Sequence, residues 1–167
     1  LFDEAQVLLS KIVSGKLLTA KGVWGLFEAN SNEQDEVELK INDDVLSTFY
    51  FLFQQRQKTA GQPNFCLSDF IAPLRSGVKD YLGVFVVTAG IGLENLVQHY
   101  ESQHDDYHAI MSKALADRLA EAFAEYLHEK IRTTYWGYEH SVWTNDELIK
   151  ESYQGIRPAP GYPSCPD

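Results

Sequence analysis

The 167 residues fit one domain with a packed core, because 44% of them are hydrophobic and 13% are aromatic. A formal net charge of −10 argues against nucleic-acid binding, which depends on clustered Lys and Arg. No apolar run approaches the length of a membrane span, and no N-terminal secretion signal is seen. The two cysteines, Cys66 and Cys165, are too few for a disulfide framework, so we expect a reducing cytoplasm.

The N-terminal part of the chain is typical of a helix followed by a hairpin. Apolar side chains at helical spacing predict an amphipathic helix over residues 2–13 that ends at Gly15, and we expect its apolar side to lie on a sheet. Residues 23–29 then read as a strand. Residues 36–41 alternate apolar and charged side chains, and the polar segment 30–35 is typical of a hairpin connection.

The next segment adds a strand, a loop and a short helical turn. A turn over residues 42–44 precedes a predicted strand over 46–53, which is rich in aromatic residues. Polar residues 54–63 predict a surface loop. Ser68 with its neighbouring aspartate opens a brief helical turn that closes by Pro73.

The most apolar run of the chain, Tyr81–Ala89, predicts a central strand buried on both faces. Gly90 and Gly92 end it before a helix over residues 93–101. A glycine pair between a strand and a helix can bind an anion, but the full three-glycine nucleotide pattern is absent. We therefore favour a turn that needs positive φ.

A long helix is predicted from Asp105 or Asp106 to about Thr134, uninterrupted by glycine or proline. We expect its apolar stripe to pack on the sheet. The stripe comprises Ile110, Met111, Ala114, Leu115, Leu119, Ala122, Phe123, Tyr126, Leu127 and Ile131. Together these elements predict an α+β fold: a twisted, mainly antiparallel sheet packed against one long and several shorter helices.

The other side of this helix is charged. Glu125 and His128 have the spacing used in di-iron bundles, but the further ligands are missing and the HExxH zinc pattern is absent. No metal site is therefore predicted, and except for Glu121 the face is expected to be solvated. This face carries Lys113, Asp117, Arg118, Glu121, Glu125, His128, Glu129, Lys130 and Arg132.

The last part of the chain prepares and then forms a proline-rich strap, residues 151–166. Tyr135-Trp136-Gly137-Tyr138 predicts a helix C-cap with aromatic packing in preference to direct ligand stacking. A short helix over 145–150, capped by Thr144 or Asn145, leads into the strap. Four prolines favour a stiff, largely extended backbone over 157–166. Arg157, its only cation, is suited to a carboxylate or phosphate.

Three motifs in order resemble one family. YQGIRPAPGYPSCPD at 153–167, the segment 105–107 with 111–129, and the aromatic motif 135–138 are similar to the reactivation domain of cobalamin-dependent methionine synthase, which binds S-adenosylmethionine. The resemblance covers almost the whole chain. Family segments upstream of the first helix and beyond the strap are absent, so residues 1–167 are expected to be an incomplete single domain lacking its N- and C-terminal parts.

The resemblance implies that this module presents S-adenosylmethionine for the reductive remethylation of cob(II)alamin. Cobalamin would be held by a neighbouring module of the same polypeptide, and flavodoxin or a flavoprotein reductase would supply the electron. The chain would act as part of methionine synthase, with no catalytic acid or base of its own, and the isolated fragment is not expected to be active. The implied binding residues are Arg157, Pro158, Ala159, Pro160, Gly161, Tyr162, Glu121 and Glu151.

Two other functions stay open from the residues alone. A stand-alone S-adenosylmethionine-dependent methyltransferase would use Gly90 and Gly92 as its cofactor loop. A protein-interaction module would instead present the proline-rich strap to a partner.

Overall fold

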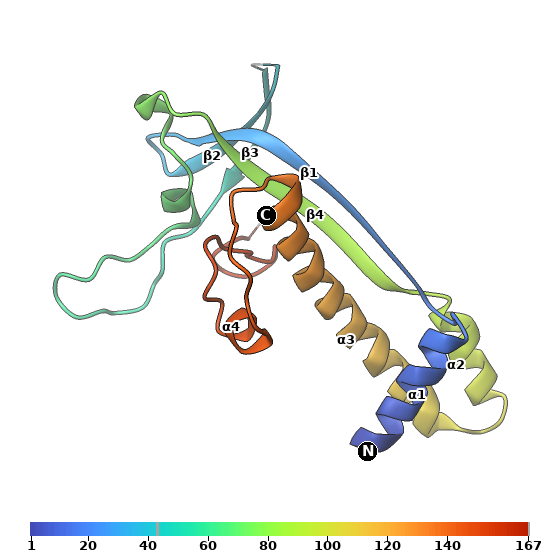
Figure 1. Cartoon of the computed structure of the whole chain (residues 1–167). Coiled ribbons are helices and arrows are strands. Elements are labelled where there is room, and N and C mark those ends of the chain that lie inside the picture. Colours follow the sequence, from blue (N-terminus) through green and yellow to red (C-terminus); the bar gives the residue numbers. More distant parts are fainter. Residues whose placement is uncertain (43, 167) are drawn as a thin grey trace. The chain divides into compact units, whose positions relative to one another are not determined.

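The computed structural model describes residues 1–42 and 44–166 (Figure 1). Helices and strands follow along the chain in the order α1 (Phe2–Ser14), β1 (Thr19–Ser31), β2 (Glu36–Ile41), β3 (Asp44–Tyr50), β4 (Asp80–Ile91), α2 (Leu93–Glu101), α3 (Asp106–Lys130) and α4 (Asn145–Ile149). Two short 3₁₀ turns lie at Leu67–Phe70 and Leu74–Ser76, and one π-helical turn lies at Ile131–Tyr135. The predicted α+β class is confirmed.

The four strands form one sheet in the order β3-β2-β1-β4. β1 and β2 pair antiparallel, with Ala29 opposite Leu39, and β2 pairs antiparallel with β3. The turn between β1 and β2 is fixed by Asn32, whose Oδ1 accepts from the backbone N–H of Gln34 at 2.9 Å and of Glu36 at 3.1 Å. The predicted hairpin is therefore confirmed.

The chain divides into two compact units, each with its own hydrophobic core. Unit 1 comprises Leu1–Trp24 and Phe85–Val142, and unit 2 comprises Gly25–Val84 and the chain from Trp143 onward. No helix within the described residues is long and apolar enough to cross a membrane. The single domain expected from the chain length stays a prediction.

The core of unit 1 joins three helices. Leu8 and Ile12 of α1 are buried against Leu96 of α2 and Met111 of α3. The expectation that the apolar side of α1 lies on a sheet was therefore wrong, and Val13, assigned to that side, is 66% exposed. Leu8 and Ile12 are one helical turn apart and face the same way, whereas Val13 turns away from them.

α3 packs against the first part of β1, as expected for the long helix. A Cβ at Gly22 would lie 3.1 Å from the ring of Phe123, so glycine allows strand and helix this close approach. The predicted stripe holds only in part, because Ile110 and Tyr126 are 66% and 54% exposed. Small side chains occupy the buried face in their place, and Ala109, Ser112 and Ala116 are all buried there.

The core of unit 2 lies on the β1–β2 hairpin. Ala29, Val37 and Leu39 are buried there, with Phe27, Phe49, Phe51, Ile71 and Leu82 packed against them. Ile41, expected to face inward, is 45% exposed because it ends its strand. β3 ends at Tyr50, three residues before the predicted end. The predicted turn includes residue 43, which lies outside the described residues.

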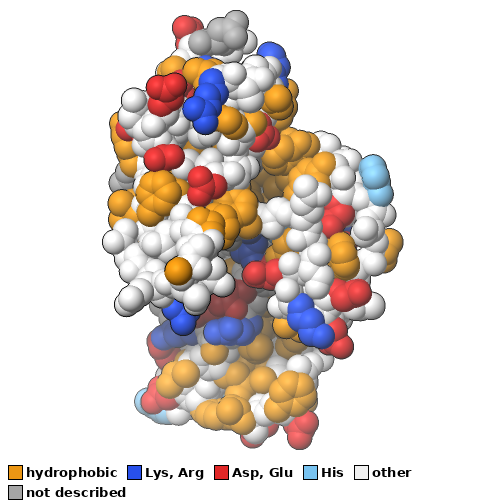
Figure 2. Space-filling view, turned by 90° about the vertical axis from the view of Figure 1, so that its left-hand side faces the viewer, with side chains coloured by type: hydrophobic (Ala, Val, Ile, Leu, Met, Phe, Trp, Pro, Cys, Tyr) orange, Lys and Arg blue, Asp and Glu red, His pale blue; other side chains and the backbone are white. Residues whose placement is uncertain are grey.

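β4 is an edge strand, which corrects the prediction of a central strand buried on both faces. Val86 is 67% exposed, and of the twelve residues only Ala89 is buried. Hydrophobic side chains also reach the surface among charged ones on the face shown in Figure 2. The apolar character of this run thus reflects β-propensity, because many large side chains stay exposed.

Gly92 begins α2 in the left-handed region, with φ of 100°. A Cβ there would lie 2.7 Å from the carbonyl oxygen of Leu17, so both backbone conformation and packing require glycine. The predicted positive-φ turn is confirmed at Gly92. Gly90 instead lies within β4, where a Cβ would meet nothing within 4 Å.

Candidate functional site

The candidate site is built in unit 2 from the strap and the chain that follows β3. α4 leads into it and starts with a capping box. The Glu147 N–H donates to Thr144 Oγ1 at 3.4 Å, and Glu147 Oε2 accepts from the Thr144 N–H at 2.9 Å. This backbone hydrogen bond lowers the pKa of Glu147. The predicted cap at Thr144 is confirmed, and the helix ends at Ile149.

Glu151 reverses the chain immediately after α4. Its φ is 51°, and its N–H donates to the carbonyl of Leu148 at 3.0 Å. A left-handed residue directly after a helix is a common way for the helix to end, and the Ser152 N–H donates to the Glu147 carbonyl at 3.0 Å in the same turn. The side chain of Glu151 is exposed and lies outside the helix, at the start of the strap.

The strap folds back on itself, which corrects the expectation of an extended backbone from 157 to 166. Residues 156–159 carry no helix or strand, and Gly161 then adopts φ of 90°. The Gly161 N–H donates to the Cys165 carbonyl at 2.8 Å, and the Cys165 N–H donates to the Tyr162 carbonyl at 2.8 Å. Pro163 follows Tyr162 in this closed loop, where its fixed φ favours a tight turn.

A pocket of about 460 Å³ lies between the strap and residues Leu52–Gln55. The strap contributes Pro158, Ala159 and Tyr162. The opposite wall is fixed to the loop after β3, because the Gln54 N–H donates to the Phe65 carbonyl at 2.9 Å. Concave sites of this size that combine apolar walls with a few polar groups are typical of small-molecule binding.

The structure brings several of the predicted site residues together within unit 2. Pro158, Ala159 and Tyr162 line one pocket, while Pro160 and Gly161 form the turn between them. Arg157 is exposed and directly precedes the pocket-lining segment. Glu151 starts the same strap in unit 2.

Glu121 belongs to unit 1, where it lies on α3. Its side chain is 64% exposed and pairs with Arg118, whose Nη1 lies 2.7 Å from Glu121 Oε2. Its expected role at the ligand stays a prediction.

The wall at residues 52–55 was missed by sequence reasoning, which assigned Leu52 and Phe53 to a strand. In the sequence these two apolar residues read as the end of a strand, whereas in the structure Leu52 is 52% and Phe53 41% exposed. Their place opposite the strap depends on tertiary structure.

The solvated charged face predicted for α3 was wrong at His128 and Arg132. Arg132 is 1% exposed, and its Nε donates to Glu139 Oε2 at 2.7 Å. Arg132 Nη1 also lies 2.7 Å from Nδ1 of the buried His128. This network ties the chain beyond α3 back to the helix. No metal-binding cluster of three His, Cys, Asp or Glu side chains is found among the described residues.

The aromatic motif after α3 is a helix end with packed rings, as predicted. Gly137 has φ of 77°, and the N–H of Trp136 donates to the Ile131 carbonyl at 2.8 Å. Tyr135 stacks on Trp24 with ring centroids 4.5 Å apart, and Trp136 meets Tyr138 edge to face at 5.2 Å. Packing within unit 1 therefore accounts for the three aromatic side chains of this motif.

Comparison with known proteins identifies the family. The family model described as the vitamin B12 dependent methionine synthase activation domain matches residues 1–167. A solved structure, described as the MetH reactivation domain bound to AdoHcy, is similar with a TM-score of 0.89 and 51% identity. The match covers 99% of this chain and 51% of that one, so the chain spans about half the length of the solved relative. The chain therefore belongs to the family of vitamin B12 dependent methionine synthase activation domains.

Proposed function

We propose that this chain binds S-adenosylmethionine and presents it for the reductive remethylation of cob(II)alamin in methionine synthase. Membership of the family supports this function, as does the AdoHcy bound by the similar MetH domain. The observation that carries the proposal is the pocket formed by Pro158, Ala159 and Tyr162 directly after Arg157. Cobalamin would be held by a neighbouring module of the full enzyme.

The residues of the strap fit the proposed ligand. A guanidinium at Arg157 can hold a carboxylate through two parallel hydrogen bonds. Pro158 and Pro160 lack N–H donors, so this backbone presents mainly carbonyl acceptors, which suit the ammonium and hydroxyl donors of the ligand. Tyr162 adds a ring that is 65% exposed beside the pocket. Glu151, at the start of the strap, carries a negative charge that would oppose the ammonium or sulfonium.

The protein's contribution to the reaction would be positioning. When bound, S-adenosylmethionine supplies a methyl group on a positively charged sulfur. The sulfur is the leaving group, and because of its positive charge it needs no general acid. Fixing one reactant in line with another can supply several kcal/mol, about 7–11 in the most favourable cases. The strap would do this at low entropic cost, because Pro158 and Pro160 are already restricted before a ligand arrives.

The wider setting follows from the same proposal. An electron donor, flavodoxin or a flavoprotein reductase, would act on the full enzyme in the cytoplasm. The two cysteines of this chain are free and buried, which is compatible with a reducing compartment.

Calorimetry of the full-length enzyme with S-adenosylmethionine tests the function. Arg157→Ala should weaken binding by about 1.5–3 kcal/mol, the range for hydrogen bonds to charged groups. Arg157→Lys should recover only part of this, because an ammonium cannot make the paired contact. Lys11→Ala, which removes an exposed cation from α1, is the matched control and should leave affinity unchanged. Equal affinities for Arg157→Ala and the control would remove Arg157 from the site.

The glycine-loop methyltransferase is disfavoured by the structure. Gly92 is required by its φ of 100° and by the Leu17 carbonyl 2.7 Å from a Cβ at this position, which explains this glycine without a cofactor. The family match over the whole chain also supports the activation domain. A full-length enzyme that gave no heat with S-adenosylmethionine would instead favour the interaction module.

A further inference from the structure

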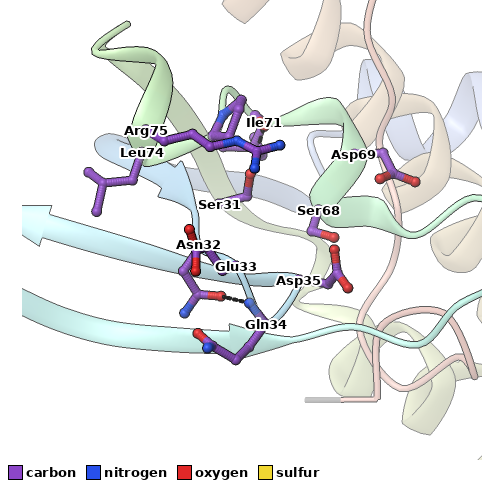
Figure 3. Close-up of a pocket in the computed structure, with 11 residues that line it drawn as sticks. Ser31, Asn32, Glu33, Gln34, Asp35, Ser68, Asp69, Ile71, Leu74 and Arg75 are labelled. Atoms are coloured by element: carbon purple, nitrogen blue, oxygen red, sulfur yellow. Dashed lines mark hydrogen bonds between the residues drawn. The ribbon is translucent and has the colours of Figure 1, made fainter.

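A second and larger pocket lies in unit 2, lined by the β1–β2 turn and the two 3₁₀ turns. Its volume is about 850 Å³ (Figure 3). No residue of the strap lines it, so it is separate from the candidate site described above.

The walls of this pocket are held by side-chain hydrogen bonds to backbone. Ser31 Oγ donates to the Ile71 carbonyl at 3.0 Å, and Ser31 N–H donates to the Ala72 carbonyl at 3.1 Å. Asn30 Nδ2 donates to the carbonyls of Ala72 and Val78, both at 2.9 Å. The segment after Ile71 is thereby fixed to the end of β1, and the pocket has a preformed shape.

Ser68 supplies a buried polar atom at the pocket wall. The residue is 2% exposed, and its Oγ has no hydrogen-bond partner among the described residues. In Figure 3 the hydroxyl points to the side of the pocket where Asp35 lies. Leaving a buried hydroxyl without a hydrogen-bond partner costs about 1–3 kcal/mol of stability. A hydrogen bond with a ligand would recover this free energy.

Opposite charges line the pocket without pairing with each other. Arg75 lies on one side, and Glu33 and Asp35 belong to the turn between β1 and β2. Within residues 1–42 and 44–166 none of these three side chains forms an ion pair. Asp35 also has φ of 60°, a left-handed conformation of the kind found at ligand sites.

We propose that this pocket binds a free α-amino acid with an apolar side chain. The guanidinium of Arg75 receives the carboxylate, because a fixed fork of donors matches two carboxylate oxygens. The carboxylates of Glu33 and Asp35 receive the ammonium group, and the Ser68 hydroxyl adds a neutral hydrogen bond. Ile71, Pro73 and Leu74 provide the apolar surface against which the side chain packs.

Calorimetry with L-leucine as the probe tests this site on the full-length enzyme carrying Arg157→Ala, which weakens the strap site. We expect saturable binding of L-leucine. N-acetyl-L-leucine lacks the ammonium, and L-leucine amide lacks the carboxylate, so each should bind at least about tenfold more weakly. L-Glutamate should also bind more weakly, since its side chain is charged and would face an apolar wall. Blocked ligands that bind as well as L-leucine, or no binding of L-leucine, would overturn the proposal.

Three variants assign the contacts. Arg75→Gln should weaken L-leucine binding at least about tenfold, yet change binding of the amide little, because only the carboxylate contact is lost. Asp35→Asn should weaken L-leucine but leave N-acetyl-L-leucine unchanged, and asparagine tolerates the left-handed backbone at this position. Ser68→Ala should weaken all three ligands alike. Variants that reduce every ligand equally at Arg75 and Asp35 would contradict the zwitterionic arrangement. Failure of S-adenosylmethionine to bind wild-type enzyme would bear only on the strap site.

Discussion

Arg132 and Glu139 form a buried ion pair across the end of α3, with Nε 2.7 Å from Oε2 and side chains 1% and 5% exposed. Arg132 also contacts His128 one turn earlier on the helix at 2.7 Å. Arg132 itself lies in the π-helical turn Ile131–Tyr135, and Glu139 follows the aromatic motif that ends at residue 138. The pair therefore fixes the path of the chain from α3 to the aromatic motif at 135–138.

Removal of one member of this pair should destabilise unit 1 strongly. Glu139→Ala leaves the Arg132 charge buried without its carboxylate, and breaking a buried pair costs about 3–5 kcal/mol. Urea unfolding measures the change in the free energy of unfolding. Arg118→Ala removes an exposed pair with Glu121, whose side chains are 74% and 64% exposed, and should cost at most about 1 kcal/mol. Similar losses of unfolding free energy in both variants would mean that the buried pair contributes no more to stability than the exposed pair.

The packed face of α3 can be tested with two adjacent residues. Met111→Ala should lower the free energy of unfolding by about 2–5 kcal/mol, because Met111 is 6% exposed and packs against α1 and α2. Ile110→Ala removes a similar number of side-chain atoms from a residue that is 66% exposed, and should change stability by about 0.5 kcal/mol or less. Denaturant unfolding of both variants distinguishes the faces, and a reversed order would contradict the packing.

Gly92→Ala should destabilise the start of α2. The added Cβ meets the Leu17 carbonyl at 2.7 Å, and φ of 100° is strained for alanine, so we expect a loss of about 2 kcal/mol or more. Thermal unfolding is the measurement. Gly90→Ala is the control, because a Cβ there meets nothing within 4 Å, and its effect should be small. A variant at Gly92 that melted like wild type would show that the turn can rearrange.

Gly161→Ala should weaken S-adenosylmethionine binding through the backbone of the strap. No atom lies within 4 Å of the added Cβ, so the effect comes from φ of 90°, a strain of about 1–3 kcal/mol. Relief of that strain would shift the carbonyls and the Tyr162 ring beside the pocket. Calorimetry with S-adenosylmethionine measures the affinity of the full-length enzyme.

Gly77→Ala provides the matched comparison for this test. Gly77 has φ of 69° and also has no atom within 4 Å of an added Cβ, but it lies outside the strap. This variant should lose stability without losing affinity for S-adenosylmethionine. Equal affinity losses in both variants would indicate a general effect on folding.

The N-cap of α3 should make stability depend on acid pH. The His108 N–H donates to Asp105 Oδ1 at 3.1 Å and holds the pKa of this carboxyl below its ordinary value of 3.8. A lowered pKa in the folded state means that the contribution is complete above the ordinary pKa and is lost as pH falls through the lowered one. Asp105→Asn keeps a capping side chain but cannot titrate. Between about pH 6 and pH 2, the difference in melting temperature between wild type and variant should be constant at the upper end and shrink as pH falls below 3.8. A constant difference across this range would contradict the assignment.

Local chemistry explains which parts of the fold could be predicted. Gly15, Gly92 and Thr144 mark helix ends through their own backbone or side-chain preferences, and the helices begin or end beside them. Strand order depends on contacts between distant segments, so the apolar run of β4 was misplaced at the centre of the sheet. The burial of Arg132 also could not be predicted, because it depends on Glu139 beyond the end of the helix.

The candidate site was predictable to a similar degree. Prolines and Gly161 marked the strap directly, and the resemblance supplied the roles of its residues. The opposite wall could not be found from the pattern, because Leu52 and Phe53 resemble the end of a strand. The position of Glu121 on a helix was predictable from the sequence. Its ion pair with Arg118 does not test whether it also contacts a ligand.

β1 and β4 each pass from one unit into the other, after Trp24 and after Val84, so neither unit is a continuous piece of sequence. On the ribosome, residues 1–24 must wait for residues 85–142 before the three-helix core can close. Long-range closure of this kind slows folding, and it leaves α1 without its partners during synthesis. Truncation at any single point would accordingly remove part of both units or leave one incomplete.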